Sequence, residues 1–550
     1  MQSFRRLSVP LAALVLALAT VLFRLPTLGS LSNDHYLYMA WAQQVLSGEL
    51  PGRDFVDPGM PLAYSLSALV QYARPGPFSE GVFSILLLAL AAGATCLVVT
   101  RLSQSLAAGV LAALFQIALQ PRLYSYPKVL VPAVALWLLQ RYIAGPSRGR
   151  LAAMAAWTVA GALLRYDLGL YAAAGLGIGI AIAHWGEARR MAMAVGSYVL
   201  ALGLVLLPYV AFVEWREGVA AHLHETVEYT RNETHALDFP WPTFPALEAN
   251  ASAAWSPDDS AAFLFYVAYG LAVTPWLLLL ATRRRQRRDT TAVVAAAGVM
   301  LAAYLVVILR YPIETRIQDL AGVMTLTGAW TVVELLRLAR SGAARGGLAP
   351  IGGAVATAVL AATVTLGAGA SVWVLGKVGE QLEETRVLDG WGKVQERIGV
   401  IRDAGTVWPW DRFWPAGPLP AAVRYLNACT QPGDRVLLTW SAPEYYYFSR
   451  RAFAGGHAIP LPPRAFTGSA DQNLMLRRLA RASVPIVLIN ETRQEQFKTA
   501  YPQIAAYLQA QYVPGGQFTV RDGSNITIAR RKGLAPARSF EDTGWPCFTP

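Results

Sequence analysis

The sequence predicts an α-helical membrane protein that carries a small α/β domain at its C-terminal end. Of its 550 residues, 54% are hydrophobic and only 15% are charged, whereas soluble domains contain roughly 25% charged residues. The hydrophobic residues gather in runs of about 20, the length that an α-helix needs to cross a bilayer. These runs stop at about residue 376, and from about residue 421 strand-like and helix-like segments alternate, as in α/β domains.

The apolar runs predict about eleven membrane-spanning helices. The run from Pro61 to Ala73 is too short to cross a bilayer, and we expect it to form a helix along the membrane surface. We therefore expect a transmembrane domain over residues 1–376, with a long first loop at 26–80. The predicted spans are at about 7–25, 81–101, 104–120, 127–143, 150–165, 167–185, 191–213, 260–281, 290–309, 317–337 and 350–376.

Basic residues predict the orientation of these spans. Cytoplasmic loops are enriched in lysine and arginine, and the arginines here fall in alternate loops. A cytoplasmic N-terminus in an inner (plasma) membrane places them all on the cytoplasmic side. Because the arginines are distributed in this way, the formal net charge of +12 does not indicate that the protein binds nucleic acid. The basic groups are Arg5/Arg6, Arg101, Arg141/Arg148/Arg150, Arg189/Arg190, Arg283 to Arg288 and Arg337/Arg340/Arg345.

The opposite, extracytoplasmic side then collects segments in which charged and aromatic residues occur together. Ionisable residues near the ends of membrane spans are costly and commonly functional. These segments are the loop 26–80, the turns 121–128, 165–167 and 310–316, the loop 214–260, and everything after about residue 377.

The extracytoplasmic tail is predicted in two parts. Residues 377–420 form a linker with a charged helical run followed by the aromatic stretch 407–414, which we expect to anchor at the membrane interface. Residues 421–550 form the α/β domain, in which Tyr445 to Phe448 either pack in the core or stack on sugars. Its predicted strands are 435–440, 484–489, 517–520 and 526–529, and its predicted helices are 471–482 and 502–512.

Two cysteines of the tail, Cys429 and Cys547, can form one disulfide or remain as thiols, and the sequence leaves both open. The isolated histidines His35 and His457 are predicted to be solvated.

The first loop carries an ordered set of acidic, aromatic and turn residues. The pattern is Asp34-x-Tyr36-x-Tyr38-x-Ala40, Gly48, Pro51, Arg53-Asp-Phe55, Asp57-Pro58 and Pro61-Leu-x-Tyr64. It resembles the first extracytoplasmic loop of the GT-C glycosyltransferases of the protein-mannosyltransferase and aminoarabinose-transferase type. The resemblance implies a GT-C-like fold and an inverting glycosyltransferase. Such an enzyme moves a sugar from a polyprenyl-phosphate donor in the membrane lipid to an extracytoplasmic glycan, lipid or protein of the cell envelope.

In this family a loop aspartate acts as general base, and the corresponding residue here is Asp34. A carboxylate can accept the proton that the acceptor hydroxyl loses as the sugar leaves phosphate. The alternative is that Asp34 caps the helix that follows it, although Ser32 or Asn33 could do so instead. His35 stands where relatives carry a second acid, which leaves open whether a divalent cation is held; no cofactor is predicted beyond that.

A lipid-phosphate leaving group requires cations near the base. The candidates are Arg53, Lys128, Arg165, Arg310 and Arg316, and the alternative role for them is contact with lipid headgroups. Arg165 and Asp167 flank a span boundary, where a turn could pair them as a structural ion pair. Asp54 either binds sugar or acceptor hydroxyls or caps a turn.

Two other functions fit the same sequence. One is a transporter or flippase of a lipid-linked glycan, although such proteins place ionisable residues within their spans, and here they are nearly absent. The other is a membrane-anchored sensor or binding protein that uses the C-terminal domain.

Overall fold

The computed structural model describes most of the chain. The described residues are 2–29, 31–57, 59–233, 241–244, 255–283, 285–309, 312, 314–343, 348–414, 419–458, 466–520 and 522–549. They divide into two compact units. The first comprises 1–27, 82–208 and 238–398, and the second comprises 28–81, 209–237 and 399–550.

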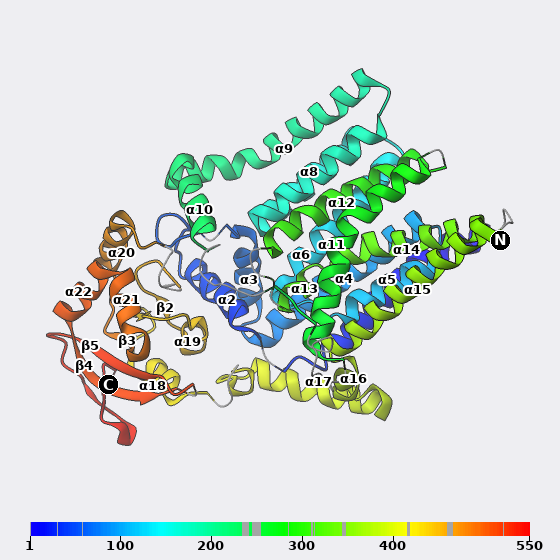
Figure 1. Cartoon of the computed structure of the whole chain (residues 1–550). Helices are drawn as coiled ribbons and strands as arrows, with labels where there is room; N and C mark the ends of the chain where they lie inside the picture. Colours follow the sequence, from blue (N-terminus) through cyan, green and yellow to red (C-terminus); the bar gives the residue numbers. More distant parts are fainter. Residues whose placement is uncertain are drawn as a thin grey trace. The chain divides into compact units, whose positions relative to one another are not determined.

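Long helices make up the first unit and run alongside one another (Figure 1). Each apolar range predicted from the sequence is occupied by one of them. Among the described residues, seven helices (α1, α4, α8, α9, α11, α12 and α15) are long and apolar enough to cross a membrane. The helices are α1 (Gln2–Arg24), α4 (Pro77–Ser103), α5 (Leu106–Ala118), α6 (Tyr126–Ile143), α7 (Arg148–Leu164), α8 (Tyr166–Ala183), α9 (Ala188–Arg216), α11 (Pro257–Thr282), α12 (Arg288–Ile308), α14 (Ala321–Ala343) and α15 (Leu348–Leu375).

Glycines allow α8 to approach its neighbours closely. A Cβ atom at Gly175 would lie 2.8 Å from the carbonyl oxygen of Ala296 on α12. A Cβ atom at Gly179 would lie 2.5 Å from the side chain of Leu139 on α6. Small residues permit such backbone approach between membrane helices. The close packing of α6, α8 and α12 fixes the ends of these helices, which carry the candidate site described below.

The second unit begins with two helices of the first loop, α2 (Asn33–Leu46) and α3 (Pro61–Ala73). The second of these has the predicted bounds. Both helices are buried on one side, and Tyr36, Met39 and Ala40 of α2 are fully buried. A short helix, α10 (Val219–Glu233), also belongs to this unit.

A five-stranded mixed sheet forms the centre of the C-terminal domain, in the order β2-β1-β3-β5-β4. The first three strands of this order are parallel, and β3, β5 and β4 are antiparallel. All four predicted strands are present as β1 (Arg435–Leu438), β3 (Ile486–Asn490), β4 (Tyr512–Thr519) and β5 (Asn525–Arg531). The sequence prediction missed β2 (Ala452–Phe453), which has only two residues.

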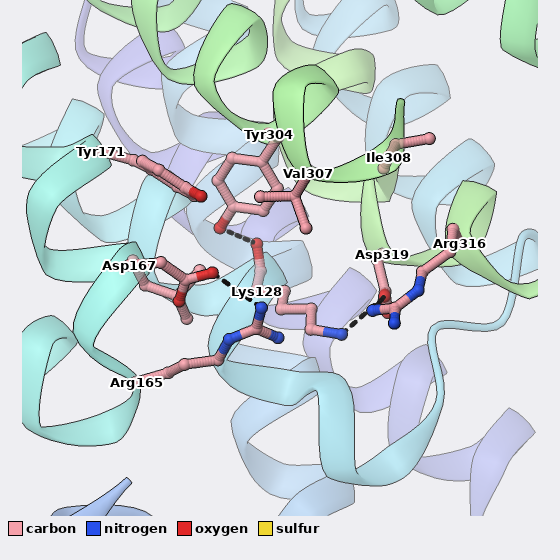
Figure 2. A pocket seen from close by; sticks show the side chains of 10 residues that line it. Lys128, Arg165, Asp167, Tyr171, Tyr304, Val307, Ile308, Arg316 and Asp319 are labelled. Atoms are coloured by element: carbon pink, nitrogen blue, oxygen red, sulfur yellow. Dashed lines mark hydrogen bonds and ion pairs between the residues drawn. The ribbon is translucent and has the colours of Figure 1, made fainter. Parts of the chain in front are cut away.

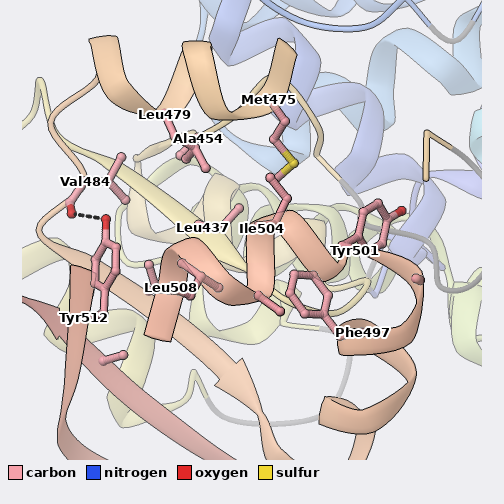
Figure 3. Close-up of a cluster of buried hydrophobic side chains, with 14 residues drawn as sticks. Leu437, Ala454, Met475, Leu479, Val484, Phe497, Tyr501, Ile504, Leu508 and Tyr512 are labelled. Carbon is pink, nitrogen blue, oxygen red and sulfur yellow. Dashed lines mark hydrogen bonds between the residues drawn. The ribbon is translucent and has the colours of Figure 1, made fainter. Parts of the chain in front are cut away.

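Helices cover this sheet and complete its apolar core (Figure 3). The predicted helices are present as α20 (Ser469–Arg481) and α22 (Pro502–Gln511), and α21 (Gln494–Ala500) lies between them in sequence. The core includes Leu437, Leu479, Val487, Ile504 and Leu508, each at most 5% exposed.

The first loop packs against the C-terminal domain within the second unit. The Gln44 side chain donates a 2.9 Å hydrogen bond to the carbonyl oxygen of Phe453, and the Tyr447 hydroxyl donates one of 2.9 Å to Gln71. Glu49 forms an ion pair with Arg435 of β1. The sequence-based division assigned the loop to residues 1–376, whereas the compact units group it with the tail.

Cys429 and Cys547 form a disulfide across 118 residues. It joins α18 (Ala421–Cys429) to β7 (Trp545–Cys547), which pairs with β6 (Arg538–Phe540). A disulfide stabilises mainly by restricting the unfolded chain, so we expect the Cys429→Ser/Cys547→Ser variant to lose about 2–4 kcal/mol of unfolding free energy. Thermal unfolding with and without reductant would check this. Equal stability of the variant and the oxidised protein would contradict it.

Three predictions about the second unit are resolved. His35 and His457 are 1% and 9% exposed, so the prediction that they are solvated was wrong. His35 lies 3.3 Å from Glu80, and Glu80 also accepts hydrogen bonds from Ser67 and Gln71. Most aromatic side chains of the stretch 407–414 are buried, which argues against the expected role of this stretch as a membrane anchor. Residues 445–448 pack in the core, in α19 (Pro443–Ser449). The buried aromatic residues of the linker are Trp410, Phe413 and Trp414.

Glu444 of α19 gives the second unit a pH-dependent stability. Burial raises the pKa of its carboxyl from 4.5 to about 7. Between pH 4.5 and about pH 7, the Glu444 carboxyl keeps its proton in the folded chain and loses it in the unfolded chain. The free energy of unfolding therefore falls as the pH rises through this range. We expect Glu444→Gln to stabilise the protein by about 2–3 kcal/mol at pH 8 and to change little at pH 4.5. Thermal unfolding at both pH values, with Glu495→Gln as an exposed control, would check this; an equal effect at both pH values would contradict it.

Candidate functional site

A small pocket lies at one end of the helices of the first unit (Figure 2). Its walls come from the start of α6, the break between α7 and α8, the end of α12, and the short helix α13 (Glu314–Asp319). These segments are far apart in sequence but meet because α6, α8 and α12 pack closely. The lining residues are Lys128, Arg165, Asp167, Leu168, Tyr171, Tyr304, Val307, Ile308, Arg316 and Asp319.

Lys128 and Asp319 form the most buried ion pair of the pocket. The Lys128 Nζ atom lies 2.6 Å from Asp319 Oδ2, and the two side chains are 9% and 8% exposed. Lys128 is in the first turn of α6 and Asp319 is the last residue of α13. A cation at a helix start and an anion at a helix end both oppose the helix dipole. Each charge is therefore stabilised by its partner and not by its own helix.

Arg316 extends this pair on the same short helix. Its guanidinium group lies 3.6 Å from Asp319 Oδ2, and its side chain is 26% exposed. Arg316 and Asp319 are three residues apart, so they lie on one face of α13. Two cations thus share one carboxylate.

Arg165 and Asp167 form a second ion pair, with 2.7 Å between Arg165 Nη2 and Asp167 Oδ2. Two residues this close in sequence would point apart on a continuous helix. Arg165 instead adopts an extended backbone, with φ −169° and ψ 126°, between the end of α7 and the start of α8. The break between α7 and α8 is the turn that the sequence analysis required for Arg165 and Asp167 to form an ion pair.

Two tyrosines support the pocket. The Tyr304 hydroxyl of α12 donates a 2.9 Å hydrogen bond to the carbonyl oxygen of Lys128, and the rings of Tyr171 and Tyr304 lie 5.3 Å apart. Sequence reasoning missed Asp319 and Tyr304. Asp319 fell inside a predicted span at 317–337, although its spacing from Arg316 could have drawn attention to it.

The structure therefore unites four of the eight predicted site residues in one pocket, namely Lys128, Arg165, Asp167 and Arg316 (Figure 2). Arg310, another cation predicted to bind the donor phosphate, lies outside the described residues.

Asp34 is exposed and is the second residue of α2. The helix begins at Asn33 and its N-cap residue is Ser32, so the alternative role of Asp34 as the helix cap does not apply. The side chain of Asp34 makes no hydrogen bond or ion pair with any residue that the structure describes. A carboxylate that has no partner in the described part of the chain is available to a substrate.

Arg53 and Asp54 bind each other in the second unit. Arg53 Nε lies 2.7 Å from Asp54 Oδ2, which also accepts a 3.0 Å hydrogen bond from the backbone of Leu50. Burial raises the pKa of Asp54, but these hydrogen bonds and the charge of Arg53 outweigh burial and lower it. The neighbouring Asp57 accepts hydrogen bonds from the backbone of Gly59 and from the Tyr209 hydroxyl. Both aspartates thus hold turns in place, and a role of Asp54 in binding hydroxyls stays a prediction.

Within the described ranges, no group of three or more histidine, cysteine, aspartate or glutamate side chains is arranged to hold a metal ion. The pocket itself contains three cations and two carboxylates. Its excess of positive charge, its guanidinium groups and its apolar wall suit an anionic group attached to an apolar chain.

No family model matches the chain, and no curated protein matches it.

Proposed function

We propose that this protein is an inverting glycosyltransferase that transfers a sugar from a polyprenyl-phosphate donor to an extracytoplasmic acceptor of the cell envelope. The observation that carries the proposal is the pocket in which Lys128, Arg165 and Arg316 meet. These residues were predicted to bind the donor phosphate from three separate stretches of sequence. Because the three side chains line one pocket, a single shared ligand explains them better than three separate contacts with lipid headgroups.

The pocket suits the leaving group of such a reaction. As the bond between the sugar and the phosphate oxygen breaks, negative charge grows on the phosphate. Lys128 and the two arginines would stabilise this charge through charge-assisted hydrogen bonds. Asp319 and Asp167 hold these cations in place before the donor arrives. Leu168, Val307 and Ile308 supply apolar surface for the first part of the polyprenyl chain.

Asp34 would act as the base. The acceptor hydroxyl attacks the anomeric carbon while its proton passes to the Asp34 carboxylate, and the bond to the lipid phosphate breaks. The products are the glycosylated acceptor and free polyprenyl phosphate. The exposed Asp34 carboxylate, which has no partner among the residues that the structure describes, can accept the proton without breaking any described interaction.

The disulfide supports an extracytoplasmic position for the C-terminal domain. Disulfides persist in oxidising compartments and are rare in the cytosol. Cys429 and Cys547 lie in this domain, and the loop that carries Asp34 belongs to the same compact unit.

A transporter of a lipid-linked glycan is the second candidate. The observation in its favour is the buried Lys128–Asp319 pair among helices, because transporters use ionisable groups of this kind. A flipping assay with a labelled lipid in proteoliposomes separates the two functions. Translocation without sugar transfer would favour the transporter.

The proposed function is tested by incubating the purified protein with a panel of polyprenyl-phosphate sugars and measuring free lipid phosphate. We expect release with at least one sugar, and more release when an acceptor is added. A protein that binds these lipids but releases no phosphate from any of them, with or without acceptor, would contradict the proposal.

A further inference from the structure

A hairpin of two helices follows the last long helix of the first unit. It consists of α16 (Val378–Thr385) and α17 (Trp391–Thr406), joined by the short helix η3 (Val387–Asp389). The two helices are tied together by a 2.7 Å ion pair between Glu384 and Arg397. Helix α16 and the joint lie in the first unit, and Figure 1 shows α16 near the end of α15.

The hairpin is fastened to the ends of long helices. Arg397 Nε donates a 3.1 Å hydrogen bond to the carbonyl oxygen of Pro26, just after α1. The Gln120 side chain, just after α5, donates one of 2.6 Å to the carbonyl oxygen of Gly376, just after α15. Helix α16 also packs against α1 and α15. Because α1 and α15 are candidate membrane spans, the hairpin is held where these helices leave the apolar layer.

The joint of the hairpin exposes large apolar side chains. Val387, Leu388 and Trp391 are 49%, 85% and 57% exposed. The inward side of the hairpin has its own buried residues, Val378 and Val394. The exposed residues are therefore not needed to hold the hairpin against the bundle.

Charged side chains beside this joint are paired with each other. Arg386 lies 3.2 Å from Asp389, and Lys393 lies 2.8 Å from Glu396. Such local pairing lowers the cost of bringing the segment close to an apolar layer. Tryptophan beside aliphatic residues is also the combination that favours the interfacial region of a bilayer.

We propose that Val387, Leu388 and Trp391 insert into the interfacial layer of the bilayer and hold the hairpin on the membrane surface. Trp373, which lies two residues before the end of α15, is also 55% exposed. This membrane contact replaces the one expected from residues 407–414, whose aromatic side chains are mostly buried. It is independent of the catalytic function.

The test places a fluorescent probe at the joint in the full-length protein. Leu388→Cys is labelled with an environment-sensitive dye after reconstitution in lipid nanodiscs, with the unsubstituted protein as labelling background. A substitution at an 85% exposed side chain should not disturb the fold. Lipids with a nitroxide near the headgroup should quench this probe several-fold more strongly than a probe at Glu495→Cys, a control position with an 85% exposed side chain on α21. If the probe at position 388 is quenched no more strongly than the control probe, the proposal is overturned. This holds whether position 388 faces water or is covered by another protein.

Discussion

Asp34→Asn is expected to abolish sugar transfer while the protein stays folded in the membrane. Asparagine has nearly the same shape but cannot accept the proton of the acceptor hydroxyl. A positioned general base contributes about 10²- to 10⁴-fold to a rate, so we expect a loss of that size in kcat. The fold should be unaffected, because the side chain of Asp34 is exposed and makes no hydrogen bond or ion pair with any described residue. Release of free polyprenyl phosphate and the thermal unfolding temperature would be measured together.

Asp258→Asn provides a matched control. Asp258 is also exposed and also the second residue of a long helix, α11. The two substitutions therefore make the same change in charge at the same place relative to a helix start. Only Asp34→Asn should reduce transfer. Full activity of the Asp34 variant would remove Asp34 as the base.

Breaking the Lys128–Asp319 pair is expected to cause the largest loss of stability. Either Lys128→Met or Asp319→Leu leaves a buried charge that has lost its closest partner, which costs about 3–5 kcal/mol. The double variant replaces the pair with apolar side chains and should recover most of that loss. Unfolding temperatures of the three variants would be compared with Arg287→Met. That control removes one partner of an exposed pair and should cost at most about 1 kcal/mol.

The double variant also separates binding from folding. If Lys128 contacts the donor phosphate, the recovered protein should still show a donor KM raised by roughly tenfold or more. If the pair is only structural, stability and transfer should recover together. A double variant with an unchanged KM for the donor would contradict a phosphate-binding role of Lys128.

Much of the fold was predictable because its determinants are local. Apolar runs of bilayer length predicted the long helices, and the shorter apolar run from Pro61 to Ala73 predicted α3 with its observed bounds. The strands of the tail were predicted because each is a short run of β-branched and aliphatic residues between turns. By contrast, β2 has two residues and too little sequence to produce a pattern.

The candidate site was predictable only in part because it depends on tertiary contacts. The sequence identified Lys128, Arg165 and Arg316 as cations near span ends, but it did not identify Asp319 as the partner of Lys128. The two residues are 191 positions apart. The burial of His35 was missed for the same reason: its partner Glu80 comes from a different helix. The aromatic linker was taken for a membrane anchor because aromatic residues suit both an interface and a core.

The most direct test of the account concerns the side of the membrane on which Asp34 and the pocket lie. Single cysteines at Asp34 and at Leu309, an exposed residue at the end of α12 beside the pocket, would be treated with a membrane-impermeant thiol reagent in intact cells. A cysteine at Arg285, in the predicted cytoplasmic loop, serves as the reference. We expect positions 34 and 309 to react from outside and position 285 to react only after permeabilisation. If positions 34 and 309 react from opposite sides, Asp34 and the cationic pocket cannot serve one reaction.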